Sequence, residues 1–222
     1  MVKVLGHRGG RGEGWPAENS IAAFARAFAE GADGVELDVR LSRDGVPVLL
    51  HDPKLADGRV VGRCLRAELD AATLDDALDV CRGKIVNVEV KPDAPQRFAL
   101  VRAVARSLAR AARDVEVVVS SFDPAIVLAF AALAPRHPRA MLVGARTPRL
   151  TTRLPLALRR LVVAAHLHDT LVSAAVAARI RAAGLRLCVW TVNDASRASE
   201  LAALGAEWLI TDGPREIVAA TR

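Results

Sequence analysis

The sequence has few of the residues that cross-link a chain or carry it across a membrane. It contains only three cysteines, Cys64, Cys81 and Cys188, which are odd in number and far apart. They fit neither a disulfide framework nor a zinc knuckle, and they indicate a reduced, cytoplasmic setting. No apolar run approaches the ~20 residues that a membrane-spanning helix needs. The N-terminus shows no basic segment followed by an apolar stretch, so we expect no signal peptide.

The composition is that of a globular protein. Hydrophobic residues make up 52% and charged residues 25% of the 222 positions, which is too apolar for intrinsic disorder. A chain of this length buries a sizeable core without disulfide or metal cross-links. Because no linker or shift in composition divides the chain, we expect one domain over residues 1–222.

Acidic residues are missing from one long stretch, between Asp123 and Asp169, which contains seven arginines. This stretch accounts for the positive net charge of the chain, +6. A basic region attracts anions such as a phosphodiester, an anionic lipid surface or a nucleic acid. Because no aromatic residues alternate with these arginines to stack on bases, we do not expect a nucleic-acid partner. We interpret the stretch as a solvated face, with peripheral contact to anionic lipid as the alternative.

Short β-branched runs alternate along the chain with amphipathic, alanine-rich stretches. The runs predict strands at residues 2–5, 34–41, 85–90, 115–120, 140–143, 161–165, 185–190 and 208–211. The stretches predict helices at residues 20–30, 73–81, 95–113, 124–134, 155–160, 170–183, 195–204 and 214–220. Several of these helices start with proline in the first turn or after Ser, Thr, Asp or Asn, as helix caps require.

The order of these elements gives eight strand–helix units in a row. Divided among eight units, the chain provides about 28 residues for each, close to a minimal (β/α)8 barrel. An open, doubly wound parallel sheet is the competing arrangement. We predict an α/β fold with a single (β/α)8 TIM-type barrel, because the count favours it and because the chemically active residues cluster at strand ends.

Polar residues gather where the first three predicted strands end. Glu36 and Asp38 are two residues apart on the second strand, so both side chains point to the same side. Glu89 and Lys91 have the same spacing at the end of the third strand. Active-site residues of such barrels come from the carboxyl ends of the strands. The other side chains with suitable chemistry near these ends are His7, Arg8 and His51.

Three carboxylates that face into a barrel are costly to bury unless positive charge lies between them. Glu36, Asp38 and Glu89 offer the oxygen ligands that Mg²⁺ and Ca²⁺ prefer. Zinc fits less well, since its sites usually contain more histidine or cysteine. The competing interpretation is a set of structural ion pairs, with Glu89 bound to Lys91 or Arg8. We predict a site for one divalent cation, Mg²⁺ or Ca²⁺.

A series of short motifs resembles one enzyme family. In chain order the motifs are HRG at 7–9, ENS at 18–20, GADGVELDV at 31–39, DG at 44–45, HD at 51–52, EVK at 89–91, SF at 121–122, WTVN at 190–193 and TDGP at 211–214. The ordered set covers nearly the whole chain and resembles the glycerophosphodiester phosphodiesterases. This resemblance implies a TIM-type barrel that uses a divalent metal to hydrolyse glycerophosphodiesters to glycerol 3-phosphate and an alcohol.

The resemblance also implies roles for individual residues. Glu36, Asp38 and Glu89 match the metal ligands of the family, and His7 and His51 match its general acid and base. Histidine suits both tasks because its unperturbed pKa is near neutrality. The sequence leaves open which histidine acts as the base. It also leaves open whether the nucleophile is water or the 2-hydroxyl of the substrate's own glycerol, which would first give a cyclic phosphate.

Four further positions match residues around the substrate. Arg8 and Lys91 match positions close to the phosphate, and an arginine offers a fork that fits phosphate oxygens. Trp190 matches a residue that shapes the glycerol and phosphate pocket, and Asn19 matches a position that shapes the site. We expect a small-molecule glycerophosphodiester to bind here. The sequence does not determine the oligomeric state.

Two other functions fit the same residues. A related barrel phospholipase would act on lysophospholipids or other lipid phosphodiesters and would use the arginine-rich stretch at the lipid surface. A non-catalytic barrel that binds anions would not need the complete set of carboxylates and histidines. The segment 53–72 is shorter than the insertion common in the family, so the preferred alcohol stays open.

Three more polar residues near strand ends receive structural interpretations. His166 and His168 follow the sixth predicted strand, and we interpret them as packed or solvated side chains. We expect Asp212 to cap the last helix or to order its loop, with Pro214 in the first helical turn.

Overall fold

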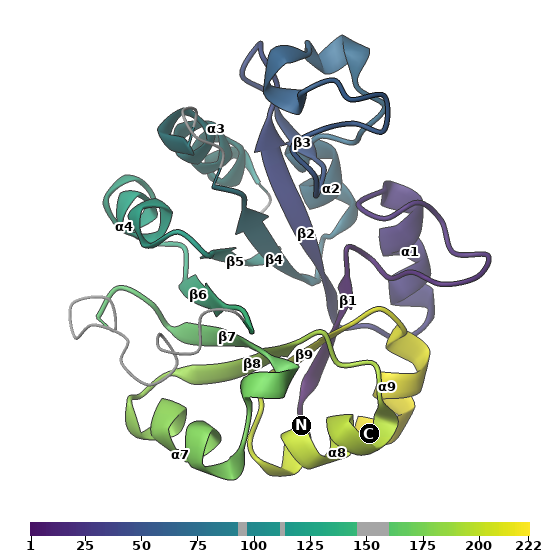
Figure 1. The fold of residues 1–222 in the computed structure, drawn as a ribbon, viewed down its shortest axis with the longest axis vertical. Helices are drawn as coiled ribbons and strands as arrows, with labels where there is room; N and C mark the ends of the chain where they lie inside the picture. Colours follow the sequence, from purple (N-terminus) through teal and green to yellow (C-terminus); the bar gives the residue numbers. More distant parts are fainter. Residues whose placement is uncertain (93–96, 112–113, 146–159) are drawn as a thin grey trace.

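Eight parallel strands close into a barrel in the computed structural model, which describes residues 1–92, 97–111, 114–145 and 160–222 (Figure 1). The strands pair in sequence around the ring, and β1 pairs with both β2 and β9, which closes it. The barrel strands are β1 (Lys3–His7), β2 (Gly34–Leu41), β4 (Ile85–Val90), β5 (Glu116–Ser121), β6 (Arg139–Val143), β7 (Ala164–His168), β8 (Arg186–Trp190) and β9 (Trp208–Thr211). The predicted TIM-type barrel is confirmed, and the open sheet is excluded.

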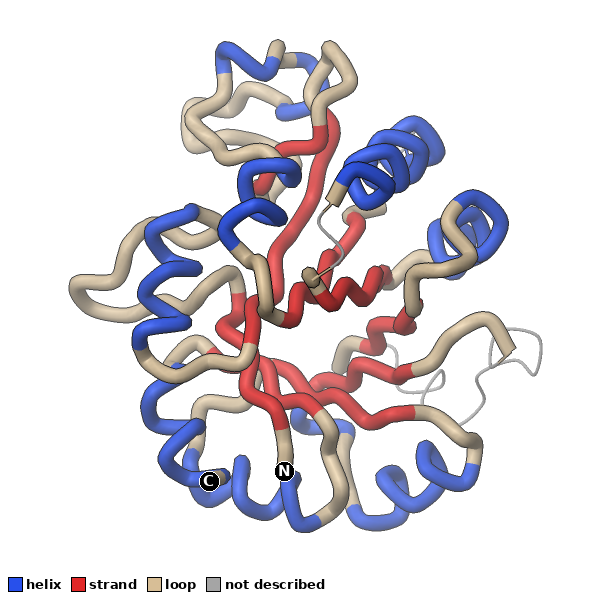
Figure 2. Tube along the Cα trace, turned by 180° about the vertical axis from the view of Figure 1, so that it is seen from behind, coloured by secondary structure: helices blue, strands red, loops and turns tan. Residues whose placement is uncertain are grey.

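Helices cover the outside of the barrel (Figure 2). In the described part of the chain, the α-helices are α1 (Ile21–Ala29), α2 (Leu74–Val80), α3 (Arg97–Arg110), α4 (Pro124–Leu133), α7 (Ala174–Ala182), α8 (Ala195–Ala203) and α9 (Pro214–Thr221). The side chains of Ser20 and Thr73 accept hydrogen bonds from the backbone of Ala23 and Asp76, which satisfies free N–H groups where α1 and α2 begin. Among these helices, none is both long and apolar enough to cross a bilayer.

The sixth barrel strand differs from its predicted position. β7 begins at Ala164 rather than at Leu161 and includes His166 and His168. Its ends are set by pairing with β6, where Ala164 lies opposite Ala140, and this register is not visible in the local sequence pattern. The helix predicted at 155–160 lies almost entirely outside the described residues.

A short antiparallel strand, β3 (Pro47–Leu49), was not predicted and pairs with the end of β2. The turn between the two strands contains Gly45 at a φ of 82°, a conformation that glycine adopts without strain. Residues 53–72 then form two short 3₁₀ turns, η1 (Val61–Arg63) and η2 (Arg66–Glu68), beyond the end of β2 (Figure 1). The hairpin returns the chain to the mouth of the barrel, where His51 follows β3.

The barrel interior is mostly apolar but contains three unpaired polar side chains. Its apolar residues are Leu5, Ile85, Val118, Ala140, Ala164, Cys188, Trp208 and Ile210. Side chains alternate along a strand, so Asn87, Ser120 and His166 face the same interior as the apolar residues two positions before them. All three are buried, and their side chains have no hydrogen-bond partner among the described residues. The ring of His166 packs edge-on against Trp208, as expected for a packed histidine.

We predict that His166 makes the barrel sensitive to acid. Burial lowers the pKa of His166 to about 3, whereas a histidine in the unfolded chain has a pKa of about 6.5. Below about pH 6.5 the unfolded state binds more protons than the folded state, so the free energy of unfolding decreases as the pH is lowered. Between pH 7 and pH 5 we expect this one group to cost about 2 kcal/mol. Urea unfolding of the wild type and of a His166→Leu variant at both pH values measures the effect.

The His166→Leu variant should lose about 2 kcal/mol less than the wild type between the two pH values. The comparison cancels the contribution of the carboxylates, which titrate in both proteins. Equal losses in the two proteins would show that His166 is not held neutral in the folded state.

Candidate active site

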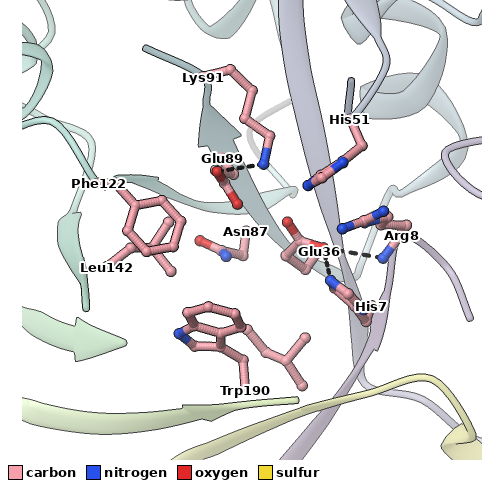
Figure 3. A pocket seen from close by; sticks show the side chains of 11 residues that line it. His7, Arg8, Glu36, His51, Asn87, Glu89, Lys91, Phe122, Leu142 and Trp190 are labelled. Carbon is pink, nitrogen blue, oxygen red and sulfur yellow. Dashed lines mark hydrogen bonds and ion pairs between the residues drawn. The ribbon is translucent and has the colours of Figure 1, made fainter. Parts of the chain in front are cut away.

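A cavity of about 160 Å³ opens at the carboxyl end of the barrel. It is lined by His7, Arg8, Glu36, His51, Asn87, Glu89, Lys91, Phe122, Leu142, Trp190 and Ile210. Figure 3 shows the charged side chains and the two histidines on one side of this cavity, Phe122, Leu142 and Trp190 on the other, and Asn87 between them. The structure thus brings the predicted site residues together, with Asp38 and Asn19 in contact with them rather than in the lining.

Strands β2 and β4 bring the three predicted carboxylates together. Glu36, Asp38 and Glu89 each offer one oxygen, and these oxygens all lie within 4.8 Å of one another. Asp38 lies opposite Glu89 in the pairing of β2 with β4, and Glu36 precedes Asp38 on the same face. All three side chains are buried. Parallel pairing therefore accounts for a cluster that neither strand forms alone.

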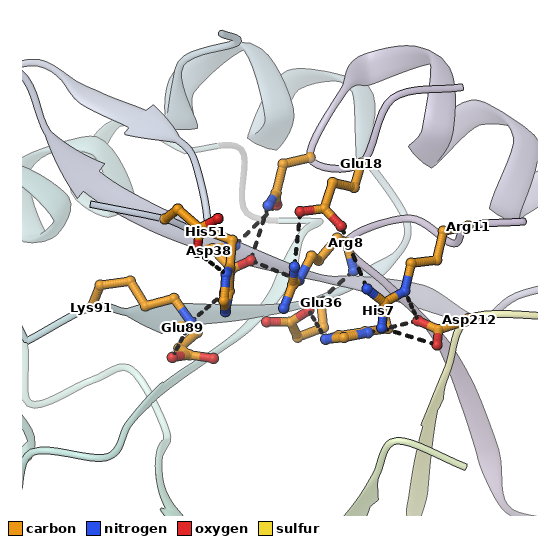
Figure 4. A network of polar contacts seen from close by, with 12 residues as sticks. His7, Arg8, Arg11, Glu18, Glu36, Asp38, His51, Glu89, Lys91 and Asp212 are labelled. Atoms are coloured by element: carbon orange, nitrogen blue, oxygen red, sulfur yellow. Dashed lines mark hydrogen bonds and ion pairs between the residues drawn. The ribbon is translucent and has the colours of Figure 1, made fainter. Parts of the chain in front are cut away.

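Two positively charged side chains lie against this cluster, mainly beside Asp38 (Figure 4). Lys91 Nζ lies 2.7 Å from Asp38 Oδ1 and 2.6 Å from Glu89 Oε1. Arg8 Nε lies 3.1 Å from Asp38 Oδ2. Glu36 accepts a hydrogen bond of 3.1 Å from the backbone N–H of Arg8, and its Oε2 lies 3.9 Å from His7 Nε2. The positive charge is thus concentrated on Asp38, and Glu36 is the least compensated of the three.

Burial and mutual repulsion change the protonation of these groups. Burial, with added repulsion from Asp38 and Glu89, raises the pKa of Glu36 well above its ordinary value. Burial also raises the pKa of Glu89, although Lys91 opposes it. Burial acts on Asp38 as well, but Lys91 and Arg8 outweigh it and hold the pKa of Asp38 below its ordinary value. The ionised forms of Glu36 and Glu89 are therefore not fully compensated by the described side chains.

The loop after β1 holds Arg8 and Asn19 in left-handed backbone conformations, with φ values of 53° and 57°. Gly9 has a φ of 91° and passes close to α1, where a Cβ would come within 2.7 Å of the Ala23 Cβ. Asn19 Nδ2 donates to Asp38 Oδ2 at 2.9 Å, and the Asp38 backbone N–H donates to Asn19 Oδ1 at 3.1 Å. Asn19 therefore contacts a carboxylate of the cluster and not the cavity itself.

His7 is held by Asp212, at the end of β9. The His7 Nδ1 and Asp212 Oδ1 atoms lie 2.7 Å apart, while Nε2 lies on the Glu36 side of the ring (Figure 4). Asp212 also accepts hydrogen bonds from Arg11 Nε at 2.9 Å and from Asn193 Nδ2 at 2.8 Å. Burial alone would raise the pKa of Asp212, but these hydrogen bonds outweigh it and hold the pKa far below its usual value. A carboxylate in this position fixes the orientation and tautomer of the ring.

Of the two structural roles expected for Asp212, helix capping and loop ordering, the structure supports the second. The N-cap of α9 is Gly213 and makes no side-chain hydrogen bond, so Asp212 does not cap this helix. It orders its loop instead, because Asn193 Oδ1 accepts from the Asp212 backbone N–H at 2.9 Å. The contact with His7 depends on the pairing of β1 with β9 at the closure of the barrel. Sequence spacing does not show that pairing, since 205 positions separate the two residues.

His51 enters the cavity from the loop after β3. Its Nδ1 lies 2.9 Å from Oδ1 of the exposed Asp52. Its backbone carbonyl accepts two hydrogen bonds from the buried Arg40 guanidinium, at 2.9 and 2.6 Å. Burial and the nearby charge of Lys91 lower the pKa of His51. A neutral imidazole that can accept a proton is therefore the main form at neutral pH.

The opposite wall of the cavity is apolar and fixed in place. The Trp190 ring packs edge-on against Phe122 and His168, with ring centroids 5.6 and 5.1 Å away. Trp190 Nε1 donates to the backbone carbonyl of His166 at 3.1 Å. These contacts hold the indole without contributing charge. The cavity therefore suits a ligand with a charged group on one side and carbon atoms on the other.

The carboxylate cluster fits a hard divalent cation. Its donors are oxygens, which Mg²⁺ and Ca²⁺ prefer, and Glu36 and Glu89 lack full compensation. Of the two histidines that line the cavity, His7 is already bound to a carboxylate through Nδ1. This donor set differs from the histidine- and cysteine-rich sets typical of zinc.

A TIM-type barrel with buried carboxylates, two cationic side chains and two histidines at its carboxyl rim fits a phosphoric diester hydrolase. Comparison with protein families confirms and sharpens this. The model of the Glycerophosphoryl diester phosphodiesterase family matches residues 7–84 and 65–216. The chain belongs to this family, and the predicted enzyme class is confirmed.

Individual relatives agree with this assignment. The glycerophosphodiester phosphodiesterase of Caldanaerobacter subterraneus is 26% identical over 97% of this chain and 96% of its own. The structure of an Oleispira antarctica phosphodiesterase in complex with the product sn-glycerol-3-phosphate has a TM-score of 0.90 at 28% identity, and covers 98% of this chain and 96% of that one. The glycerophosphodiester phosphodiesterase of Agrobacterium tumefaciens has a TM-score of 0.78 at 26% identity, over 99% and 100% of the two chains.

We predict that a divalent cation stabilises the protein through the carboxylate cluster. At a cation concentration of 100 times Kd, the Tm should rise by about 5–10 °C. Glu36→Gln keeps the shape of the side chain but removes a buried like charge. It should therefore raise the Tm of EDTA-treated protein and weaken or abolish the cation-dependent rise. Thermal unfolding in EDTA and after addition of Mg²⁺, Ca²⁺ or Mn²⁺ measures both effects.

Glu207→Gln is the matched control, because Glu207 directly precedes β9 at the opposite end of the barrel and pairs with Arg186. Its cation response should equal that of the wild type. A full cation response in both Glu36→Gln and Glu89→Gln would show that the cation binds elsewhere.

Proposed function

We propose that this protein hydrolyses glycerophosphodiesters to glycerol 3-phosphate and an alcohol, with one divalent cation, Mg²⁺ or Ca²⁺. The observation that carries the proposal is that one cavity has both a charged wall and an apolar wall. A glycerophosphodiester has a phosphate next to a short carbon chain, so it matches both walls. The Oleispira antarctica relative, which binds sn-glycerol-3-phosphate as its product, supports the same substrate class.

Glu36, Asp38 and Glu89 would hold the cation, which when bound neutralises phosphate charge and stabilises the negative charge of the transition state. Arg8 and Lys91 add to this attraction, because both line the cavity. Their contacts with Asp38 fix the two cationic groups before substrate arrives. Preorganised charges of this kind need no reorganisation during the reaction.

His7 and His51 serve as the acid and base pair. One imidazole takes the proton of the nucleophile as its oxygen attacks phosphorus, and the other gives a proton to the alcohol oxygen as its bond to phosphorus breaks. With Nδ1 on Asp212, His7 presents Nε2 for this transfer. The low pKa of His51 suits proton acceptance, but either assignment of the two roles agrees with the contacts. ³¹P NMR during turnover distinguishes direct attack by water from a cyclic phosphate.

The apolar wall and the flanking loops shape the substrate site. In this proposal Trp190 contacts the carbon chain of the glyceryl group. Its indole lines the cavity and is held in place by packing against Phe122 and His168. Asn19 acts on the site indirectly by holding Asp38. The predicted role of Asn19 in the site is thus one of positioning.

We also propose that residues 1–222 form one barrel domain in a reduced cytoplasm. The family match, which runs from residue 7 to residue 216 in two overlapping parts, supports the first statement. Three buried free cysteines, Cys64, Cys81 and Cys188, support the second. Four of the seven arginines of the acid-free stretch lie outside the described residues, so its role as a solvated or lipid-facing surface stays a prediction.

Release of glycerol 3-phosphate from sn-glycero-3-phosphocholine tests the proposed function. We expect turnover that EDTA abolishes and that Mg²⁺, Ca²⁺ or Mn²⁺ restores. His7→Ala and His51→Ala should each lower kcat by roughly 10²–10⁴-fold, because each removes one proton-transfer group. His137→Ala, in the turn before β6 and away from the cavity, should keep wild-type kcat.

Near-normal turnover of both histidine variants with metal present would refute the acid and base assignment. Faster hydrolysis of lysophosphatidylcholine micelles than of sn-glycero-3-phosphocholine would favour the phospholipase alternative. Absence of turnover on every diester, with anion binding retained, would favour the non-catalytic barrel.

Asp212 is expected to affect kcat through His7 alone. Asp212→Asn keeps the size of the side chain but loses the carboxylate that holds Nδ1, so kcat should fall by roughly 10–100-fold with little change in KM. Steady-state kinetics measure this split, and the cation-dependent rise in Tm should be kept. Asp33→Asn, which removes a carboxylate bound to Lys3 and the Val4 backbone, is a matched control that should not change kcat. A rise in KM with unchanged kcat would contradict the positioning role.

A further inference from the structure

Asn87 is a polar side chain in the cavity to which the proposed chemistry gives no task. It lies on β4, two residues before Glu89 and opposite Glu36 in the pairing with β2. It lines the cavity and is fully buried. Neither its Nδ2 nor its Oδ1 has a hydrogen-bond partner among the described residues. A buried carboxamide without partners is unfavourable, and because Asn87 lines the cavity, a ligand bound there would be able to satisfy it.

The direction of the side chain distinguishes between the parts of the substrate. In Figure 3 the Asn87 carboxamide points away from Glu36, toward the wall formed by Leu142 and Trp190. Among the described residues, that wall offers no free hydrogen-bonding side chain for it, because the Trp190 N–H already donates to the His166 carbonyl. The cationic groups, Arg8 and Lys91, lie on the other side of the cavity, where the phosphate belongs. The part of the ligand that reaches Asn87 is therefore the part that lies along the apolar wall.

The hydrogen-bonding capacity of Asn87 narrows the ligand further. A cation would satisfy only Oδ1, and a phosphate oxygen only Nδ2. Two neighbouring hydroxyl groups satisfy both atoms, since a hydroxyl donates as well as accepts. The glyceryl group of a glycerophosphodiester carries two such hydroxyls on adjacent carbon atoms.

We propose that Asn87 binds the two free hydroxyl groups of the glyceryl moiety, with Nδ2 donating to one oxygen and Oδ1 accepting from the other. Asn87 is then a specificity residue that selects glyceryl over simple alkyl phosphates. This inference rests on the proposed function and adds to it the residue that recognises the diol.

Two other buried polar side chains serve as a contrast. Ser120 and His166 also face the barrel interior without hydrogen-bond partners among the described residues. Neither of them lines the cavity, however. Ser120→Ala therefore removes a comparable unpaired group from the neighbouring strand without touching the proposed diol site, and it provides the matched control.

Binding of two phosphate monoesters to Asn87→Leu tests the proposal. sn-Glycerol 3-phosphate carries the diol, whereas propyl phosphate has the same phosphate and carbon chain without hydroxyls. With cation present, the wild type and Ser120→Ala should prefer glycerol 3-phosphate by about 30-fold in Kd, as expected for two neutral hydrogen bonds. Asn87→Leu should reduce this preference to about threefold or less and leave the Kd for propyl phosphate unchanged. Isothermal titration calorimetry gives all six values without reference to turnover.

Asn87→Asp and Asn87→Ala provide a second comparison if the leucine variant does not fold. Asn87→Asp keeps one acceptor, so its preference should exceed that of Asn87→Ala. A wild-type preference kept in full by Asn87→Leu or Asn87→Ala would overturn the proposal, as would an equal loss of affinity for both ligands. Failure of the wild type to release glycerol 3-phosphate from any diester would instead refute the proposed function, and the binding preference would still report on Asn87.

Discussion

The repulsion among three buried carboxylates is the interaction on which the rest of the site depends. The pairing of β2 with β4 holds one oxygen each of Glu36, Asp38 and Glu89 within 4.8 Å of one another, and burial makes their charges costly. Lys91 and Arg8 compensate Asp38 but leave the pKa values of Glu36 and Glu89 raised. A divalent cation bound between these carboxylates would reduce the repulsion, so in the proposed function the stability of the barrel and its chemistry would share one requirement.

The closure of the barrel supplies what the individual strands cannot. Only the pairing of β1 with both β2 and β9 places His7 between Glu36 and Asp212. A slip of one residue in either pairing would turn these side chains to the other face. The two histidines are anchored differently as a result. His7 is bound by a carboxylate that also accepts hydrogen bonds from Arg11 and Asn193, whereas His51 contacts an exposed aspartate and is held through its backbone by Arg40.

Local patterns in the sequence were sufficient to predict the barrel, because strand-like runs alternate with helical stretches eight times and several of those stretches begin with capping residues. They were also sufficient for the carboxylates, since Glu36 and Asp38 share a face by spacing alone. They were not sufficient where a contact joins distant strands. The carboxylate of Asp212 and the carboxamide of Asn87 gain their meaning from neighbours on other strands. The predicted bounds of β7 were wrong for the same reason, because the ends of this strand depend on pairing with β6.

In the proposed function, the two walls of the cavity recognise different parts of the substrate. The charged wall attracts phosphate over a distance but does not distinguish one phosphodiester from another, because every one carries the same anion. The apolar wall accepts any short carbon chain that fits beside Trp190. In the proposed function, discrimination therefore depends on an uncharged polar group that reaches the carbon chain, since a buried hydrogen-bonding group left unmatched is costly. Among the described residues that line the cavity, Asn87 meets this condition, because it is uncharged and its carboxamide points toward the apolar wall.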